Sequence, residues 1–223
     1  MTIDVAAVGR NVADVRTAIR RRTDRVVTLV AVTKGFDHRA VSAALAAGAD
    51  AVGENYAQEM LTKAAALEPP PAQRGTPRPV PWHFIGQLQR NKVKMIVPLG
   101  VKLWQTIDRP DLAREVAHRQ AGAHVLVQVN TTREEQKGGC EPNDAGGLVD
   151  ECRAVGLSVT GLMTIGPAGL AEEARPAFRL LRRLADDLGL PDCSMGMSGD
   201  FEVAVEEGAT IVRIGSRLFG PRG

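Results

Sequence analysis

The sequence holds few cysteines, almost no net charge and no long apolar run, and each of these shortages excludes a class of protein. Its three cysteines, Cys140, Cys152 and Cys193, are odd in number and have no C-x-x-C spacing. This pattern argues against a disulfide framework and against a structural zinc site. We therefore expect reduced thiols and no bound metal.

The charge balance gives no sign of a strongly charged partner. Lysine and arginine total 28 against 26 aspartate and glutamate residues, a formal net charge of +2, which is too small to indicate a nucleic acid or a membrane surface. No segment approaches the ~20 consecutive apolar residues of a membrane span. The charges of residues 1–25 do not fit a signal peptide either. We predict a cytoplasmic protein.

The chain is long enough to bury one sizeable core. It has 223 residues, of which 44% are hydrophobic, and no shift in composition marks an internal boundary. We therefore predict a single domain spanning residues 1–223. Residues 68–81 contain six prolines, which exclude a helix or a central strand and predict an exposed loop.

Hydrophobic residues alternate between helical and strand-like spacing along the chain. Val5, Val8, Val12, Val15 and Ile19 recur at helical spacing and predict an opening amphipathic helix. Strands are predicted at 28–32, 51–53, 83–85, 103–107, 124–129, 158–163, 193–195 and 210–214. Helices are predicted between and after them at 39–47, 56–66, 90–96, 110–121, 142–155, 171–188 and 201–206.

Five of these helices are followed by glycine, where a left-handed C-terminal cap is expected. The glycines are Gly48, Gly122, Gly156, Gly189 and Gly208. The repeated order of helix, glycine and strand is typical of βα units. Eight strands in one alternating series favour an α/β fold, a closed (β/α)8 TIM barrel with an extra N-terminal helix. A doubly wound open sheet is the alternative.

Lys34 lies at the end of the first apolar strand and is followed by Gly35. Reactive groups of a (β/α)8 barrel lie at the C-terminal ends of its strands, so this amine is in a functional position. One interpretation is a solvated lysine at a strand end. The other is an amine that apolar surroundings keep neutral often enough to attack an aldehyde.

The loops after the last two strands could hold a phosphate. Ser198 follows the predicted seventh strand, and Gly215 and Ser216 follow the eighth. These loops commonly bind phosphate in barrels of this kind, and a glycine lets the backbone approach a ligand closely. The alternative is that they are ordinary turn residues.

Arg213 lies inside the otherwise apolar strand of residues 211–214. An unpaired buried cation is costly, so Arg213 must have a partner. The partner is either an internal acid or a ring nitrogen of a cofactor such as pyridoxal phosphate. A lysine, a phosphate cradle and this arginine together indicate a phosphorylated aldehyde held as a Schiff base.

Several short motifs occur in an order that resembles the pyridoxal phosphate homeostasis protein family, small relatives of the alanine racemase barrel. The resemblance extends from Val26 nearly to the end of the chain. The motifs are Ala31-Val32-Thr33-Lys34, Gly53-Glu54-Asn55-Tyr56, Trp82-His83-Phe84-Ile85-Gly86 with Asn91-Lys92, Gly161-Leu162-Met163-Thr164, Ser194-Met195-Gly196-Met197-Ser198, and Val212-Arg213-Ile214-Gly215 with Leu218-Phe219-Gly220.

The resemblance implies a role for each residue of the predicted site. Lys34 would form a Schiff base with pyridoxal 5'-phosphate (PLP), and Arg213 would face the pyridine nitrogen. The phosphate would be held by Ser198, Gly215 and Ser216. An arginine beside the ring nitrogen would keep that nitrogen largely unprotonated, because two adjacent cations repel each other.

Three further residues lie in matching motifs or loops. Asn55 and His83 are expected near the cofactor, although Asn55 could instead cap a helix that starts at Tyr56 and His83 could be a packed core residue. Lys137 follows the fifth strand, and the matching family loop also carries a lysine. It is either a solvated loop residue or a secondary site that hands the cofactor on. We expect Cys140, nearby, to be a bystander.

The resemblance also bears on catalysis. Alanine racemases with such an arrangement use a tyrosine from a second domain as the opposite base, whereas this sequence ends at Gly223 and its only tyrosine is Tyr56. We therefore expect no catalytic residue and a monomeric carrier that binds PLP reversibly and supplies apo-enzymes, thereby affecting amino-acid and keto-acid balance. The alternatives are a PLP-dependent amino-acid racemase and a phosphosugar enzyme with an aldolase-type lysine.

Overall fold

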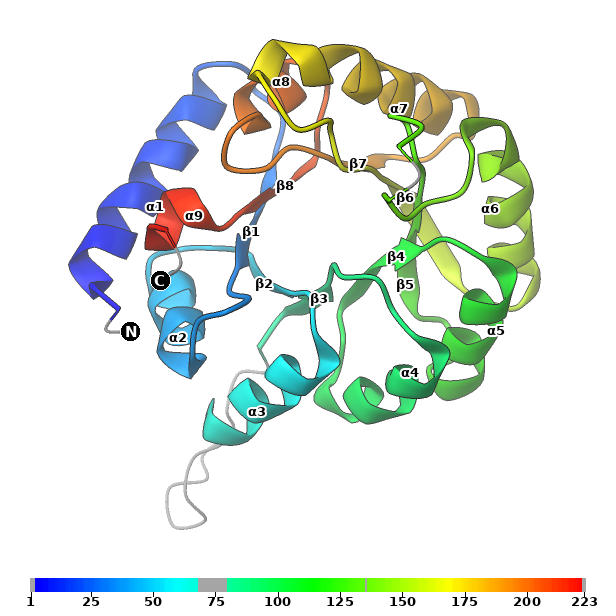
Figure 1. Ribbon diagram of the computed structural model, residues 1–223, viewed down its shortest axis with the longest axis horizontal. Coiled ribbons are helices and arrows are strands. Elements are labelled where there is room, and N and C mark those ends of the chain that lie inside the picture. The colour runs from blue at the N-terminus through cyan, green and yellow to red at the C-terminus, as the bar shows by residue number, and fades with distance from the viewer. Residues whose placement is uncertain (1–2, 68–79, 135, 222–223) are drawn as a thin grey trace.

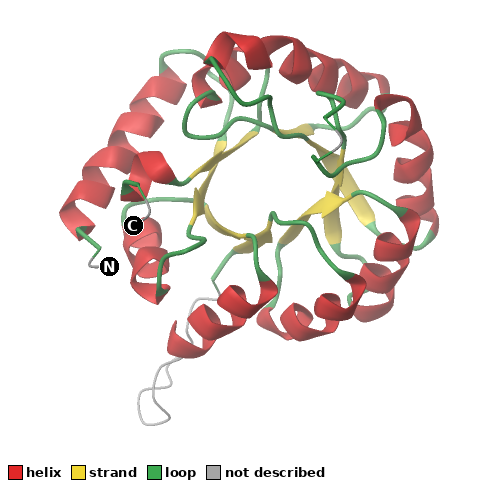
Figure 2. Cartoon of the chain, viewed as in Figure 1, coloured by secondary structure: helices red, strands yellow, loops and turns green. Residues whose placement is uncertain are grey.

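The chain winds into a closed barrel of strands inside a ring of helices (Figures 1 and 2). This computed structural model describes residues 3–67, 80–134 and 136–221. Within them, eight parallel strands pair in chain order, and β8 (Ile211–Ile214) closes the ring against β1 (Thr28–Val32). The predicted (β/α)8 barrel is confirmed, and the open-sheet alternative is wrong.

The remaining elements follow in strict alternation. The strands are β2 (Ala51–Glu54), β3 (Trp82–Phe84), β4 (Leu103–Ile107), β5 (His124–Gln128), β6 (Ser158–Met163) and β7 (Asp192–Ser194). The helices are α1 (Val5–Arg20), α2 (His38–Ala46), α3 (Ala57–Leu67), α4 (Arg90–Ile96), α5 (Pro110–Arg119), α6 (Ala145–Ala154), α7 (Arg175–Asp187), α8 (Phe201–Glu206) and α9 (Ser216–Phe219). Short 3-10 turns, η2 to η4, occupy Val97–Leu99, Pro142–Asp144 and Ala171–Ala174.

The predicted extra helix is α1, which begins after Asp4. The Asp4 side chain accepts a hydrogen bond from the Ala7 amide at 2.9 Å, which caps the first turn. The apolar residues that predicted the helix, from Val8 to Ile19, are buried. The helix contacts α2 and α9, and the side-chain amide of Asn11 donates to the Leu218 carbonyl at 2.9 Å.

The structure agrees with the predicted helix caps and differs from the prediction in two helix starts and one short helix. The five glycines predicted to end helices all have positive φ, between 63° and 94°. The predicted helices at 142–155 and 171–188 begin instead as the 3-10 turns η3 and η4. The four-residue helix α9 was not predicted. The proline-rich loop at 68–81 lies almost entirely outside the described residues.

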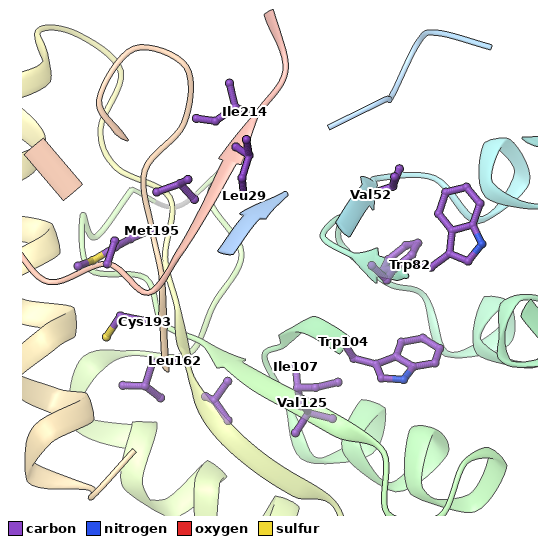
Figure 3. Close-up of a cluster of buried hydrophobic side chains, with 14 of the residues drawn as sticks. Leu29, Val52, Trp82, Trp104, Ile107, Val125, Leu162, Cys193, Met195 and Ile214 are labelled. Carbon is purple, nitrogen blue, oxygen red and sulfur yellow. The ribbon is translucent and has the colours of Figure 1, made fainter. Parts of the chain in front are cut away.

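The buried side chains form two groups. One fills the space between barrel and helices and includes Trp82, Trp104 and Ile107 (Figure 3). The other lies inside the barrel and draws on six strands: Val30, Ala51, Leu103, Leu126, Met163 and Ile211. None of the helices in the described parts of the chain has the length and apolar content that crossing a bilayer requires.

A buried polar layer lies next to this inner apolar layer. Side chains two residues apart on a strand share a face, so Gln105, Gln128 and Arg213 continue the faces of Leu103, Leu126 and Ile211. All three polar residues are buried, at 0%, 2% and 4% exposure respectively. The strands therefore place polar groups inside the barrel toward its C-terminal end.

Candidate functional site

A cavity of about 360 Å³ lies at the C-terminal end of the barrel. Its walls come from the last residues of β1 and β8 and from the segments that follow β1, β2, β3, β6, β7 and β8. The lining residues are Val32, Lys34, Phe36, Asn55, Ile85, Ile165, Met197, Ser198, Gly199, Arg213, Gly215, Ser216 and Gly220. Six of the seven residues predicted for the site are therefore brought together, and His83 is not among them.

Lys34 lies in a tight turn directly after β1. The amide of Phe36 donates to the Thr33 carbonyl at 3.0 Å, and Gly35 has a φ of 78°, which favours glycine. The Gly35 amide also donates to Glu59 Oε2 of α3 at 2.8 Å. These bonds fix the backbone on both sides of Lys34, whose side chain is half-buried and lines the cavity.

A buried ion pair supports this turn from behind. Lys63 of α3 is 4% exposed and Glu54, at the end of β2, is 0% exposed, with Lys63 Nζ 2.6 Å from Glu54 Oε1. Lys63 Nζ also donates to the Thr33 carbonyl at 2.7 Å and lies 3.2 Å from Glu59 Oε2, and the Thr33 hydroxyl donates to Glu54. The three ammonium donors thus hold β1, β2 and α3 together.

The ion pair was missed at the sequence level, although a signal exists. The buried positions of α3 are Ala57, Met60 and Lys63, which recur every three residues, so Lys63 occupies a core-facing position. Burial raises the pKa of Glu54, and its hydrogen bonds to Lys63 and Thr33 oppose that rise. Only a cation close to Glu54 makes an ionised carboxylate tolerable there.

Asn55 carries an unsatisfied acceptor at the cavity wall. Its Oδ1 atom is buried and has no hydrogen-bond partner among the described residues. Helix α3 begins at Ala57, and no capping bond to Asn55 Oδ1 is present in the described chain, so the alternative of a helix cap is not supported. Buried polar atoms are nearly always paired, which makes Asn55 Oδ1 a position for a ligand donor.

The loops after β7 and β8 meet around Ser198. Its hydroxyl oxygen accepts hydrogen bonds from the amides of Gly215 and Arg217, both at 3.2 Å. A Cβ at Gly215 would lie 3.3 Å from the Val32 carbonyl oxygen, so glycine permits the close approach of β8 to β1. Ser216 is exposed next to these amides. Ser198, Gly215 and Ser216 line the cavity, so the arrangement places two hydroxyls and the Gly215 backbone at its wall.

Arg213 is 4% exposed and does not form an ion pair among the described residues. Its Nη1 donates to Ser194 Oγ at 2.6 Å and its Nη2 to the Thr164 carbonyl at 2.7 Å. Burial lowers its pKa to about 10, an effect that the charge of Asp200 opposes. The guanidinium is held by two neutral oxygens, so the interpretation in which an internal acid is the partner of Arg213 is wrong.

His83 lies deeper, in the polar layer inside the barrel. It is 4% exposed, and its Nδ1 lies 2.9 Å from Gln105 Nε2. Burial, followed by the charge of Lys102, lowers the pKa of His83 to about 4, so the ring is neutral at pH 7. Its predicted contact with a cofactor stays a prediction, and the geometry places Gln105 between it and the other polar residues.

Lys137 and Cys140 lie in the loop after β5 and do not line the cavity. Lys137 Nζ is 2.5 Å from Glu134 Oε1 and 2.7 Å from the Gly166 carbonyl oxygen, so the lysine is held rather than freely solvated. Burial raises the pKa of Cys140 to about 11, which fits a bystander thiol. No cluster of three metal-ligating side chains occurs in the described residues.

Comparison with known proteins agrees with this geometry. Residues 3–223 match the alanine racemase N-terminal domain. The pyridoxal phosphate homeostasis protein of Aquifex aeolicus is 45% identical over 187 residues, covering 78% of each chain. That of Pseudomonas aeruginosa is 40% identical over an alignment of 233 residues, covering 98% of this chain and 97% of the other.

A solved structure extends the comparison to three dimensions. PipY of Synechococcus elongatus, determined with PLP bound, is 29% identical and superposes with a TM-score of 0.80 over 96% of this chain and all of its own. The likeness therefore includes the arrangement of the barrel as well as the order of motifs. This chain belongs to the pyridoxal phosphate homeostasis protein family.

Proposed function

We propose that this protein binds pyridoxal 5'-phosphate reversibly in the cavity at the C-terminal end of its barrel and takes part in PLP homeostasis. The observation that carries the proposal is that Lys34, Arg213 and Ser198 line one cavity although they follow or belong to three different strands. The names of the relatives and the PLP in PipY support the same ligand.

The residues of the cavity fit the chemistry of this cofactor. When bound, PLP supplies an aldehyde that condenses reversibly with a lysine amine, together with a phosphate dianion and a heteroaromatic ring. Lys34 is the amine at the cavity. The hydroxyls of Ser198 and Ser216 are donors suited to phosphate oxygens, and the amide of Gly215, which donates to Ser198 Oγ, lies beside them. Asn55 Oδ1 is a buried acceptor that still needs a donor.

Arg213 has a different task in this proposal. Two of its donors are committed to Ser194 and Thr164, which leaves the rest of the guanidinium for the cavity that it lines. A cation next to the ring nitrogen disfavours its protonation and weakens the ring as an electron sink. The site is thereby suited to holding the aldehyde rather than to activating an amino acid.

The cavity supports binding without turnover better than racemisation. Among the described residues that line it, Lys34 and Arg213 are the ionisable ones. A two-base racemase needs a proton acceptor on each face of the substrate, and Tyr56, the single tyrosine, is 59% exposed and does not line the cavity. We therefore propose a carrier that buffers a reactive aldehyde and supplies it to apo PLP-dependent enzymes.

The proposal also includes the working state of the protein. We propose a cytoplasmic monomer that acts as one domain over residues 1–223. The large apolar side chains exposed in the described parts belong to separate segments, namely Val5, Val26, Tyr56, Leu170 and Met197. The sequence positions of these residues give no sign of one contiguous apolar patch of the kind that marks an interaction site.

Covalent mapping tests the assignment of Lys34. Addition of PLP to the purified protein is expected to produce a visible absorbance band that hydroxylamine abolishes, and borohydride reduction is expected to fix a pyridoxyl group on the peptide that contains Lys34. Lys34→Ala should lose the label, whereas Lys137→Ala, a lysine outside the cavity, should keep it. Labelling of another lysine in the native protein would overturn the assignment.

Deuterium exchange separates the carrier from the racemase. The PLP-loaded protein, incubated with L- and D-amino acids in deuterated water, is expected to exchange Cα hydrogen no faster than free PLP does. Exchange well above that rate, and lost in Lys34→Ala, would establish an enzyme instead.

A further inference from the structure

A chain of hydrogen bonds crosses the barrel from Arg213 to His83. Arg213 Nη1 lies 2.6 Å from Ser194 Oγ, and Ser194 Oγ lies 2.6 Å from Gln105 Oε1. Gln105 Nε2 in turn lies 2.9 Å from His83 Nδ1. The four side chains come from β8, β7, β4 and β3, and each is at most 4% exposed. The chain therefore connects the cavity wall to the barrel interior without solvent in between.

The direction of the bonds in this chain follows from its first member and from the need of the Ser194 hydroxyl proton for an acceptor. A guanidinium can only donate, so Ser194 must accept from Arg213 and is free to donate its own proton to Gln105 Oε1. The amide group of Gln105 then points its NH₂ at His83, whose Nδ1 must accept. A neutral imidazole that accepts at Nδ1 carries its proton on Nε2.

The reversed arrangement is worse by one hydrogen bond. If the amide of Gln105 were turned around, its NH₂ would face Ser194, which would then accept from both neighbours. The hydroxyl proton of Ser194 would have no acceptor, because no third partner of Ser194 Oγ is present among the described residues. A buried unsatisfied donor costs about 1–3 kcal/mol. The forward direction is therefore favoured.

We propose that His83 is a positioning residue, which acts as the terminal acceptor of this chain and orients Arg213 toward the cavity without touching the ligand. The Nε2–H tautomer of His83 holds Gln105, Gln105 holds Ser194, and Ser194 together with the Thr164 carbonyl fixes the plane of the guanidinium. The effect on ligand binding rests on the proposed function, whereas the tautomer does not.

The tautomer can be measured on the protein without cofactor. Long-range ¹H–¹⁵N NMR at pH 7 is expected to show His83 neutral and protonated at Nε2, and its signals are assigned by their loss in His83→Asn. Observation of the Nδ1–H tautomer would overturn the inference and leave PLP binding at Lys34 untouched. If PLP fails to bind and His83 is protonated at Nε2, the proposed function is wrong, whereas the inferred direction of the hydrogen bonds from Arg213 to His83 is correct.

A second variant reads the link between Gln105 and His83. In Gln105→Glu the carboxylate accepts on both sides, so His83 must now donate from Nδ1, and its NMR signals are expected to change accordingly. An unchanged Nε2–H tautomer in this variant would mean that His83 and Gln105 are not coupled.

Affinity tests the orienting role. His83→Leu leaves the NH₂ of Gln105 without an acceptor and is expected to weaken PLP binding about tenfold. His83→Asn, whose Oδ1 can accept in place of Nδ1, should restore affinity to within about threefold of the parent. His124→Leu is the matched control, because His124 is exposed at the start of β5. Equal affinity of His83→Leu and the parent protein would refute the orienting role.

Discussion

Replacement of Lys63 by methionine is predicted to destabilise the protein strongly although Lys63 does not line the cavity. The Lys63 ammonium is within hydrogen-bonding distance of Glu54, Glu59 and the Thr33 carbonyl, and Glu54 is completely buried. Methionine fills a similar volume, so the principal change is the loss of the cation. Glu54 would then be a buried charge without a counter-ion.

The magnitude follows from the burial of both partners. Removing one member of a buried ion pair costs about 3–5 kcal/mol, whereas replacing both members is often close to neutral. For a protein of this size, 1 kcal/mol shifts Tm by roughly 2–4 °C, so Lys63→Met is expected to lower Tm by roughly 6–20 °C. The double variant Glu54→Gln, Lys63→Met should recover most of that loss.

Thermal and urea unfolding, each followed by circular dichroism and tryptophan fluorescence, measure the effect. An exposed ion pair contributes roughly 1 kcal/mol at most. If the free energy of unfolding of Lys63→Met lies within that margin of the parent's, the reasoning is refuted. A double variant as unstable as the single one would show that the loss comes from packing around the lysine stem instead of from the charge.

The pH dependence of the stability of Lys63→Met is an independent test. In Lys63→Met the pKa of Glu54, already raised by burial, rises further because an opposing hydrogen bond is gone. The native state then binds a proton that the unfolded state has released, so stability falls as pH rises through the interval between the two pKa values. The deficit of the variant should therefore be smaller at pH 5 than at pH 8.

Two further predictions concern the thiols and a tight contact. All three cysteines should react slowly with iodoacetamide at pH 8 when folded, because burial raises their pKa values to about 11 or 12; labelling as fast as in urea would contradict this. Gly86→Ala should cost about 1–3 kcal/mol in urea unfolding, because its Cβ would lie 2.0 Å from the Asn55 carbonyl oxygen. Gly9→Ala in α1, where a Cβ meets nothing within 4 Å, is the control and should be neutral or stabilising.

The barrel could be predicted from the sequence because its signals are local. Five of the helices end at a glycine that is followed by an apolar strand, and these five glycine caps have the expected left-handed backbone. The features that were not predicted are segments of only three or four residues. Helix α9 has four residues, too few for periodicity to show, and a 3-10 start such as Pro142–Asp144 runs directly into the α-helix that follows it, so the sequence does not mark the boundary.

The candidate site could be predicted only in part, for a related reason. The barrel topology places strand ends on one rim, so Lys34 and Ser198 could be assigned to one cavity from their sequence positions. The partners of Arg213 could not. A polar residue in an apolar strand indicates that a partner exists, but Ser194 and Thr164 lie 19 and 49 residues away in the sequence and meet Arg213 only in the folded barrel.

The two basic side chains that line the cavity are therefore held by different means, and different variants report on them. Lys34 is positioned through its backbone, whose turn depends on the Lys63 and Glu54 pair, so a defect there lowers stability together with affinity. Arg213 is positioned through side-chain hydrogen bonds that end at a neutral acceptor. Replacing that acceptor by another that fits should preserve both affinity and stability, whereas deleting it should lower affinity and, because the Gln105 amide is then unpaired, cost about 1–3 kcal/mol of stability.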